Sequence, residues 1–205
     1  MPEDIYMTNI AFRTMMEGVE EIVGKNGLKT ILNVAGLSQY IDNLPPANLE
    51  KGTAKISDCS KYENAIREIF GDKGAKAILF SVGAAQAIAG IEENKELAEA
   101  TLKAFEGMDN VERIRIVLST AAAGVSEQIG SEIVVTEDGD DFLYEDKLCN
   151  HCFGIKTTES ICHTASGFVY ALVRWATRKG NYDVTQIKCT GMGDESCIVR
   201  VRLKG

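Results

Sequence analysis

The hydrophobic period of this chain changes near residue 130, and that change limits its fold more than any other feature. Before this point, apolar residues recur at three- and four-residue spacings, which is typical of amphipathic helices. After it, residues 131–136 and 141–148 alternate like strands around an Asp138-Gly139 turn signal. Helical runs followed by strand, helix and strand favour α+β over a doubly wound sheet. We therefore expect N-terminal helices packed on a C-terminal antiparallel sheet.

Three local patterns place the expected elements. The run Lys73–Ile91 is mostly apolar on all sides, which predicts a central buried helix. Ser60 and Glu63 form a capping-box pattern that predicts a helix start at Ser60. The segment 51–53 extends the break at Pro45-Pro46 and is expected as a loop. The expected helices are Ile10–Val23, Leu28–Leu37, Ser60–Phe70, Lys73–Ile91, Lys95–Phe105, Val111–Ile129 and Thr158–Thr177, and the expected strands are Ser131–Thr136, Asp141–Leu148, Asp183–Thr190 and Cys197–Leu203.

Length and composition are those of an ordinary globular domain. The chain has 205 residues, of which 45% are hydrophobic and 25% charged, and it is long enough to bury a core without disulfides. We expect a single domain over 1–205, with a mainly helical scaffold in 1–130 and an α+β region in 131–205. No signal peptide is visible, and the longest uncharged apolar stretch, 77–91, is too short to span a bilayer. We therefore expect a cytoplasmic protein with no membrane span.

The charge balance argues against a nucleic-acid partner. The chain carries 22 Lys and Arg against 30 Asp and Glu, a formal net charge of −8. Nine basic and six acidic residues lie in 145–205, so that part carries +3 and the first 144 residues carry −11. Binding to nucleic acid needs clustered basic side chains along the phosphates. The acidic surplus in the helical part does not provide them.

Five of the six cysteines lie in the last 57 residues, with the spacing C-x2-C-x9-C-x26-C-x7-C, and both histidines flank members of this group. In an intracellular chain such clustering favours metal or redox chemistry over structural disulfides. Four thiolates in a tetrahedron suit zinc, and an iron–sulfur cluster is the alternative. Cys59 stands apart, and we expect it to lie outside the site. The candidate metal ligands are Cys149, Cys152, Cys162, Cys189 and Cys197.

Two other uses of these cysteines stay open. Free cysteines are often buried and only fill space. A disulfide switch between Cys149 and Cys152 would instead make the pair a redox element. The turn Gly191–Ser196 is close to a dinucleotide fingerprint but lacks its third glycine and lies between expected strands, so we interpret it as a tight turn.

The last third of the chain resembles the 4-vinyl reductase domain family. The resemblance rests on Cys162-His163 with the following stretch 165–170, and on the run from Cys189 to Cys197. It also takes in 149–154, and the matching segment ends at about Val201. The resemblance implies a fold shared with transport-particle subunits and with the sensor domains of phenol-responsive activators. Those relatives bind hydrophobic small molecules and are commonly dimers.

The resemblance also implies a ligand set for zinc. In the phenol sensors three cysteines and a glutamate hold the ion, and the three cysteine positions match Cys162, Cys189 and Cys197. Here the glutamate position holds Gln186. A neutral amide is a poor zinc ligand, so we expect Cys149 or Cys152 to complete the site.

Three functions follow from these observations. The first is a module that binds a hydrophobic or aromatic small molecule, with a tetrapyrrole as one candidate, in a cavity among the helices, while a metal fixes the C-terminal lobe. The second is an enzyme or subunit that modifies a tetrapyrrole, which would need an outside hydride or electron source because no nucleotide motif is visible. The third is a cysteine-based redox or metal sensor. A homodimer through the helices 10–23 and 28–37 is expected from their amphipathicity and from the habit of the family.

Overall fold

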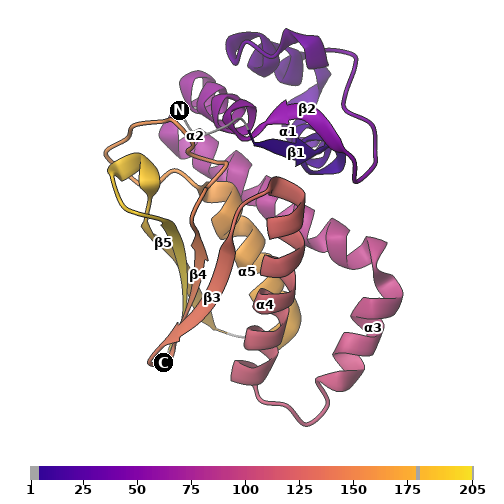
Figure 1. The fold of residues 1–205 in the computed structure, drawn as a ribbon, viewed down its shortest axis with the longest axis vertical. Coiled ribbons are helices and arrows are strands. Elements are labelled where there is room, and N and C mark those ends of the chain that lie inside the picture. The colour runs from indigo at the N-terminus through magenta and orange to yellow at the C-terminus, as the bar shows by residue number, and fades with distance from the viewer. Residues whose placement is uncertain (1–4, 179–180, 205) are drawn as a thin grey trace.

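The computed structural model describes residues 5–178 and 181–204, which form the expected α+β fold (Figure 1). A four-stranded antiparallel sheet has the order β3-β4-β6-β5, and β1 and β2 form a separate antiparallel ribbon. The helices are α1 Asn9–Val34, α2 Ile56–Glu93, α3 Lys95–Ala104, α4 Asn110–Ile129 and α5 His163–Thr177. The strands are β1 Tyr6–Thr8, β2 Lys51–Lys55, β3 Ile133–Asp138, β4 Asp141–Asp146, β5 Tyr182–Lys188 and β6 Cys197–Leu203, and the short 3-10 turns are η1 Ser38–Tyr40 and η2 Thr190–Met192.

Each of the two longest helices is interrupted at one glycine. The backbone of α1 leaves helical geometry at Gly24, where φ is +74°, and that of α2 leaves it at Gly71, where φ is +69°. Glycine adopts positive φ without the steric penalty of a Cβ. The helix ends expected near these two glycines therefore exist as breaks, and the chain resumes a helix directly after each one.

Three local expectations are wrong. The helix α2 begins at Ile56 rather than Ser60, because the Asp58 carboxylate accepts a hydrogen bond from the Lys55 backbone N–H at 3.1 Å and caps it. The segment expected as a loop at 51–53 belongs to strand β2, which pairs with β1. The helix α5 begins at His163 rather than Thr158. The segment 51–55 becomes a strand because it pairs with β1, which lies more than 40 residues away in the sequence.

The C-terminal half of α2 is not buried on all sides as expected. Ile88 on this helix is 40% exposed, whereas Leu79 and Val82 are fully buried. One described helix, α2, is long and apolar enough to cross a membrane by length and composition alone, and a third of that window is buried. The absence of a membrane span and the cytoplasmic location stay predictions.

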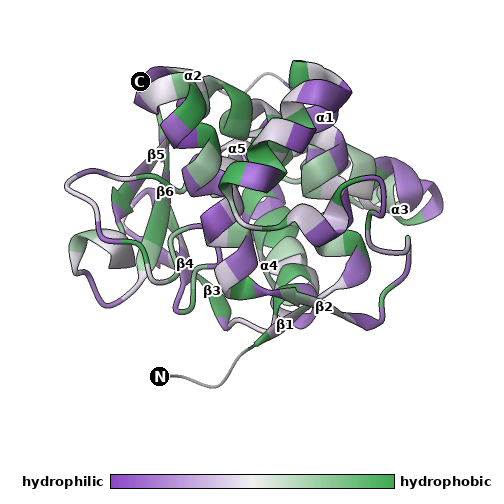
Figure 2. Ribbon diagram, turned by 90° about the horizontal axis from the view of Figure 1, so that it is seen from above, coloured by the Kyte–Doolittle hydropathy of each residue, from purple (hydrophilic) through white to green (hydrophobic). Residues whose placement is uncertain are grey.

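The helix α5 lies in the middle of the molecule, between α2, α4 and the sheet (Figure 2). It meets α2 backbone to backbone. A Cβ added at Gly83 of α2 would lie 1.9 Å from the carbonyl oxygen of Thr164, and one at Gly167 of α5 would lie 2.0 Å from that of Phe80. These two glycines let the helices approach more closely than any side chain would allow. The contact fixes the start of α5 against α2.

Two apolar clusters fill the space on either side of this contact. One packs α1 on α2 and includes the edge-to-face pair of Phe12 and Tyr62, whose ring centroids are 5.9 Å apart. The other joins α4, α5 and the sheet around Leu118, Val169 and Val199. Part of the apolar face of α1 is thus used inside the chain, and the homodimer expected through the helices 10–23 and 28–37 stays a prediction.

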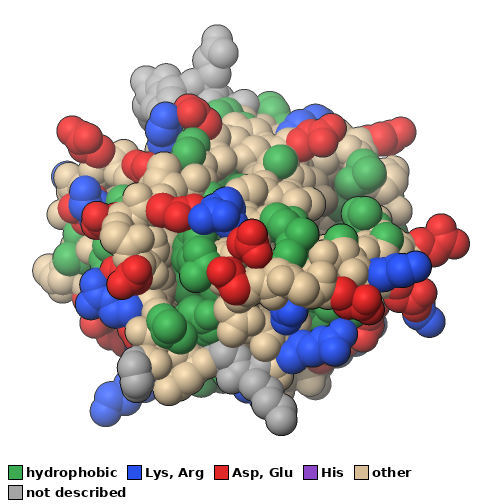
Figure 3. All heavy atoms as spheres, turned by 90° about the horizontal axis from the view of Figure 1, so that it is seen from below, with side chains coloured by type: hydrophobic (Ala, Val, Ile, Leu, Met, Phe, Trp, Pro, Cys, Tyr) green, Lys and Arg blue, Asp and Glu red, His purple; other side chains and the backbone are tan. Residues whose placement is uncertain are grey.

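The outer surface mixes charges of both signs. On the face seen from below, acidic and basic side chains alternate with apolar ones (Figure 3). This face shows no extended basic patch of the kind that tracks nucleic-acid phosphates.

The helix contact predicts a contrast between two glycines of α2. Replacing Gly83 with Ala should lower the free energy of unfolding by about 3 kcal/mol, because the new methyl group meets backbone atoms that cannot rotate away. Gly90 is exposed, and a methyl group added there would have nothing within 4 Å, so Gly90→Ala should raise stability by about 0.5–1 kcal/mol. Denaturant unfolding of both variants measures the contrast. Equal effects would show that the close contact does not exist.

Candidate metal centre

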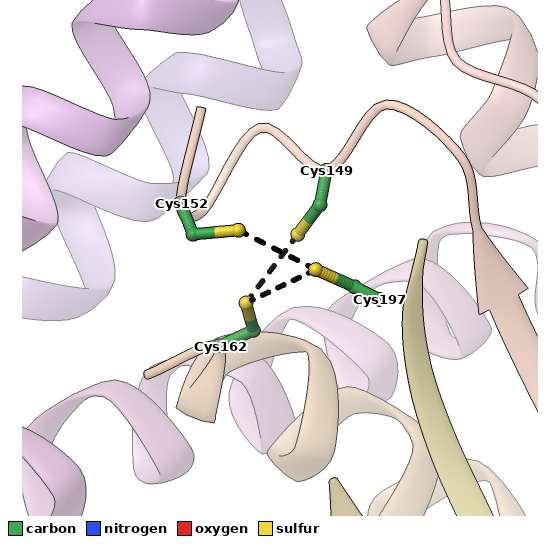
Figure 4. Close-up of side chains that lie close together, drawn as sticks. All are labelled: Cys149, Cys152, Cys162 and Cys197. Carbon is green, nitrogen blue, oxygen red and sulfur yellow. Dashed lines mark hydrogen bonds between the residues drawn. The ribbon is translucent and has the colours of Figure 1, made fainter. Parts of the chain in front are cut away.

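Four cysteine side chains converge where the segment after β4 passes over the start of α5 and the start of β6 (Figure 4). Cys149 and Cys152 lie on that segment, Cys162 is the residue before the first turn of α5, and Cys197 is the first residue of β6. All four are buried, and all four Sγ atoms lie within 4.8 Å of one another. We call this group the four-thiol centre.

The sulfur separations match those of a tetrahedral metal site. The Sγ atoms of Cys152 and Cys197 are 3.4 Å apart, those of Cys149 and Cys162 are 3.5 Å apart, and those of Cys162 and Cys197 are 3.8 Å apart. A disulfide would need about 2.05 Å, so these are free thiols. Thiolates at about 2.3 Å from a central ion are about 3.8 Å from one another. The four sulfurs need move little to hold an ion.

Cys189, the fifth predicted ligand, lies beside the centre and not in it. Its Sγ is 3.9 Å from that of Cys162, but the group within mutual reach does not include it. Its backbone N–H donates to the carboxylate of Asp194 at 2.8 Å, and its carbonyl accepts from Met192. Cys189 therefore holds the turn that leads into β6, the strand that begins with Cys197.

Mutual hydrogen bonding concentrates negative charge on one sulfur of the centre. Hydrogen bonds from Cys149 and from the other neighbouring thiols hold the pKa of Cys152 far below its ordinary value. The same contacts, together with burial, raise the pKa values of Cys149, Cys162 and Cys197. Beside the centre, although its contact with Cys152 opposes this shift, hydrogen bonds with Cys162 and Cys197 lower the pKa of Cys189 to about 6. A bound cation would favour the thiolate form of its ligands.

Polar neighbours orient the centre without joining it. The backbone N–H of Cys162 donates to Gln186 Oε1 at 2.9 Å, and Gln186 Nε2 donates to the carbonyl of Lys188 at 3.0 Å. Thr190 contacts two of the sulfurs, with its hydroxyl 3.0 Å from Cys152 Sγ and its backbone N–H 3.3 Å from Cys197 Sγ. Gln186 therefore positions Cys162, and the expectation that Cys149 or Cys152 completes the site stays a prediction. Such outer contacts tune metal sites.

A second buried group lies directly beside the first. Cys59 and Glu63 of α2 approach His151, and their ligand atoms also lie within 4.8 Å of one another. His151 Nδ1 is 2.7 Å from Glu63 Oε1, and although burial opposes it, the Glu63 carboxylate raises the pKa of His151 to about 10. Sequence analysis missed this group, because Glu63 matched a capping box and Cys59 stood alone. The four-residue spacing of Cys59 and Glu63, which places both on one face of a helix, was the available signal.

The second histidine belongs to neither group. His163 is half-buried at the start of α5, and burial lowers its pKa. The charged residues that act on it include Lys76, Glu63 and Arg67. Two histidines that flank cysteines in sequence therefore face different surroundings.

No family model matches this chain, and no curated protein matches it. Solved structures share its fold. The H-NOX protein of Shewanella oneidensis in its Fe(II)NO state aligns with a TM-score of 0.58 and 9% identity over 94% of this chain and 99% of that one. The IWP-051-bound H-NOX of Shewanella woodyi has a TM-score of 0.57 and 13% identity over 97% and 95%. A doubly substituted Tt H-NOX has a TM-score of 0.54 and 13% identity over 97% and 96%.

These neighbours correct the family assignment made from sequence. The structures that share the fold are H-NOX (heme nitric oxide/oxygen binding) domains, so the resemblance to the 4-vinyl reductase family is wrong. The motif around Cys162 and Cys189 is short and rich in cysteine and glycine, and such residues recur wherever tight turns and thiol clusters occur. At identities of 9–13%, the likeness shows the fold alone.

The neighbours also overturn the predicted cofactors. Those structures are described by Fe(II), Fe(II)NO and Fe(II)CO states and by heme, and neither zinc nor an iron–sulfur cluster is named among them. The expectation of zinc, with an iron–sulfur cluster as the alternative, is therefore wrong. Four cysteines alone do not choose between metals, since several soft ions take the same ligands.

The described part of the chain does not offer a heme slot between α2 and α5. A heme needs a slot and an axial ligand, but these two helices close on each other at Gly83 and Gly167. Two surface hollows of about 470 and 380 Å³ are lined by neither histidine nor cysteine. Their linings are Ile5, Tyr6, Lys51, Gly52 and Gly130 for the larger, and Arg13, Glu20, Lys25, Leu28, Lys29, Leu32, Tyr40, Ile41, Asp42, Asn43 and Leu44 for the smaller.

The role of Gln186 gives a testable prediction. Gln186→Ala should lower the free energy of unfolding by about 1–2 kcal/mol, because the backbone N–H of Cys162 loses its acceptor in a partly buried place. The exposed neighbour Thr185 donates only to Asp183 on the same strand, so Thr185→Ala serves as the matched control with a loss below about 0.5 kcal/mol. Thermal unfolding measures both. A variant of Gln186 as stable as the control would refute the positioning role.

Proposed function

We propose that this chain is a metal-responsive binding domain whose four-thiol centre captures one thiophilic transition-metal ion. The single observation that carries the proposal is the convergence of four buried thiols at tetrahedral separations. Cysteine thiolates are the ligands that soft metal ions prefer, and four sulfurs at these separations can surround one ion. This proposal develops the sensor function expected from the cysteine spacing.

The ion would join three parts of the chain that are far apart in sequence. Cys149 and Cys152 come from the segment after β4, Cys162 from the start of α5, and Cys197 from β6. That segment contains no helix or strand between Asp146 and His163. Its position depends on side-chain contacts, turns and a few backbone hydrogen bonds, such as the one from the Thr157 N–H to the Gly191 carbonyl at 2.9 Å. Metal binding would fix this segment, which gives a domain of this kind a structural response to the ion.

Cobalt(II) provides the direct test of the centre. Added to reduced, metal-free protein, the first equivalent of Co²⁺ should produce the visible bands of a tetrahedral site and a strong sulfur-to-metal charge-transfer band. Cys152→Ser should weaken this binding by more than the roughly 10- to 100-fold that loss of an outer-shell partner causes. Cys189→Ser, a change at a buried cysteine outside the four, should keep the tetrahedral bands. Absence of charge transfer in the unaltered chain would refute the proposal.

Metal binding should also raise thermal stability. An ion at 1,000 times its dissociation constant adds about 4 kcal/mol to the folded state. For a chain of this size, that corresponds to a rise in Tm of about 10 °C. Calorimetric scans with Co²⁺ and with a chelator measure the difference, and Cys152→Ser should lose most of it. A Tm that is the same under both conditions would count against the centre.

The sulfur pairs favour a thiol switch as a second candidate. Oxidation of Cys149 with Cys162, or of Cys152 with Cys197, would need each pair to close by about 1.4 Å to disulfide length. The Sγ atoms of Cys149 and Cys152 also lie within 4.8 Å of each other, so the expected Cys149–Cys152 switch stays a third pairing to test. Peptide mapping after mild oxidation identifies the bonded pair, and protection of both pairs by bound metal would rank the metal function first.

Small-molecule binding remains the broader proposal for the fold. The Shewanella woodyi H-NOX was solved with IWP-051 bound, so this fold accommodates a small organic molecule in at least one protein. In this chain the hollow beside Tyr6 and Gly130, about 470 Å³, is the place that such a ligand would occupy. Native mass spectrometry of purified protein tests for it, and a mass equal to that of the bare chain would argue against a resident ligand.

A further inference from the structure

We propose that Cys59, Glu63 and His151 form a second metal site, separate from the four-thiol centre, for a divalent transition-metal ion of borderline softness. We call it the mixed-ligand site. The three donor atoms, one sulfur, one carboxylate oxygen and one ring nitrogen, lie within 4.8 Å of one another. None of the three belongs to the four-thiol centre, so the two sites share no ligand residue.

The fold brings these donors together from two directions. Cys59 and Glu63 are four residues apart on α2 and point to the same side of that helix. His151 reaches them from the segment after β4, between the two cysteines of the four-thiol centre. The sulfur of Met15 on α1 lies 3.5 Å from Cys59 Sγ. This thioether therefore lies in contact with the sulfur ligand of the site.

The carboxylate of Glu63 carries an unsatisfied atom. Glu63 is 2% exposed, and its Oε1 accepts from both His151 at 2.7 Å and Thr164 at 2.8 Å. Its Oε2 is buried and has no hydrogen-bond partner among the described residues. The Asn150 side chain donates to Cys59 Sγ at 3.1 Å, and its own Oδ1 is also buried without a partner in the described part of the chain. Buried polar atoms are almost always satisfied, so a cluster of two such atoms indicates an ion or water.

The ligand chemistry also favours a divalent cation. Cys59 and Glu63 are buried. A divalent ion bound there would replace the protons of the Cys59 thiol and of the His151 imidazole, which leaves a thiolate, a carboxylate and a neutral ring as its ligands. Calcium and magnesium take oxygen ligands only, whereas the mixture of sulfur, nitrogen and oxygen selects a transition metal.

Cadmium-113 NMR tests the inference on the whole chain. We expect two equivalents of Cd²⁺ to bind and to give two resonances, one from four sulfur ligands and one shifted upfield by nitrogen and oxygen ligands. The chain has only two histidines, so imidazole nitrogen spectra report on each one. The second equivalent should shift the signal of His151 and leave that of His163 in place.

Variants separate this site from the four-thiol centre. Cys59→Ser should abolish the second resonance and keep the first, and Glu63→Gln should weaken the second equivalent at least about tenfold. His163→Gln is the matched control and should keep both resonances. Should the buried variants fail to fold, the stoichiometry and the His151 signal of the unaltered chain decide. If the unaltered chain binds a single equivalent of Cd²⁺ and the His151 signal does not shift, the inference is wrong. If the unaltered chain shows the mixed-ligand resonance but no four-sulfur resonance, the proposed function is wrong instead.

Discussion

The contact between α2 and α5 is the constraint on which the rest of the structure depends. Gly83 and Gly167 allow the two backbones to touch, and no residue with a Cβ could take either place without moving a carbonyl group. Because α5 is held this closely, its first turn has one position relative to α2. Cys162 and Thr164 at that turn are therefore placed under the segment that follows β4 and beside Glu63.

The segment between β4 and α5 is organised by side chains instead of by regular structure. Its cysteines at 149 and 152 turn toward the four-thiol centre, while Asn150 and His151 between them turn toward α2. Four consecutive residues thus serve two buried groups on opposite sides. The two groups therefore share one short stretch of backbone.

The comparison with H-NOX domains separates the fold from its chemistry. The architecture aligns over almost the whole chain, but at 9–13% identity the residues of the site are free to differ. Here α5 packs directly against α2. The polar groups in the interior are thiols, a carboxylate and one imidazole. One fold can carry unrelated sites, because a site depends on a few side chains and a fold on the whole apolar pattern.

The sequence by itself determined the fold class, the helix breaks at Gly24 and Gly71, and the residue types available for the centre. These follow from local rules of hydrophobic period, backbone freedom and ligand chemistry. Only the tertiary structure decided which cysteines meet, why Cys189 stands aside and why Glu63 is buried beside His151 instead of capping a helix. Local propensity could not show these results, because each depends on contacts between segments that are 13 to about 90 residues apart in the chain.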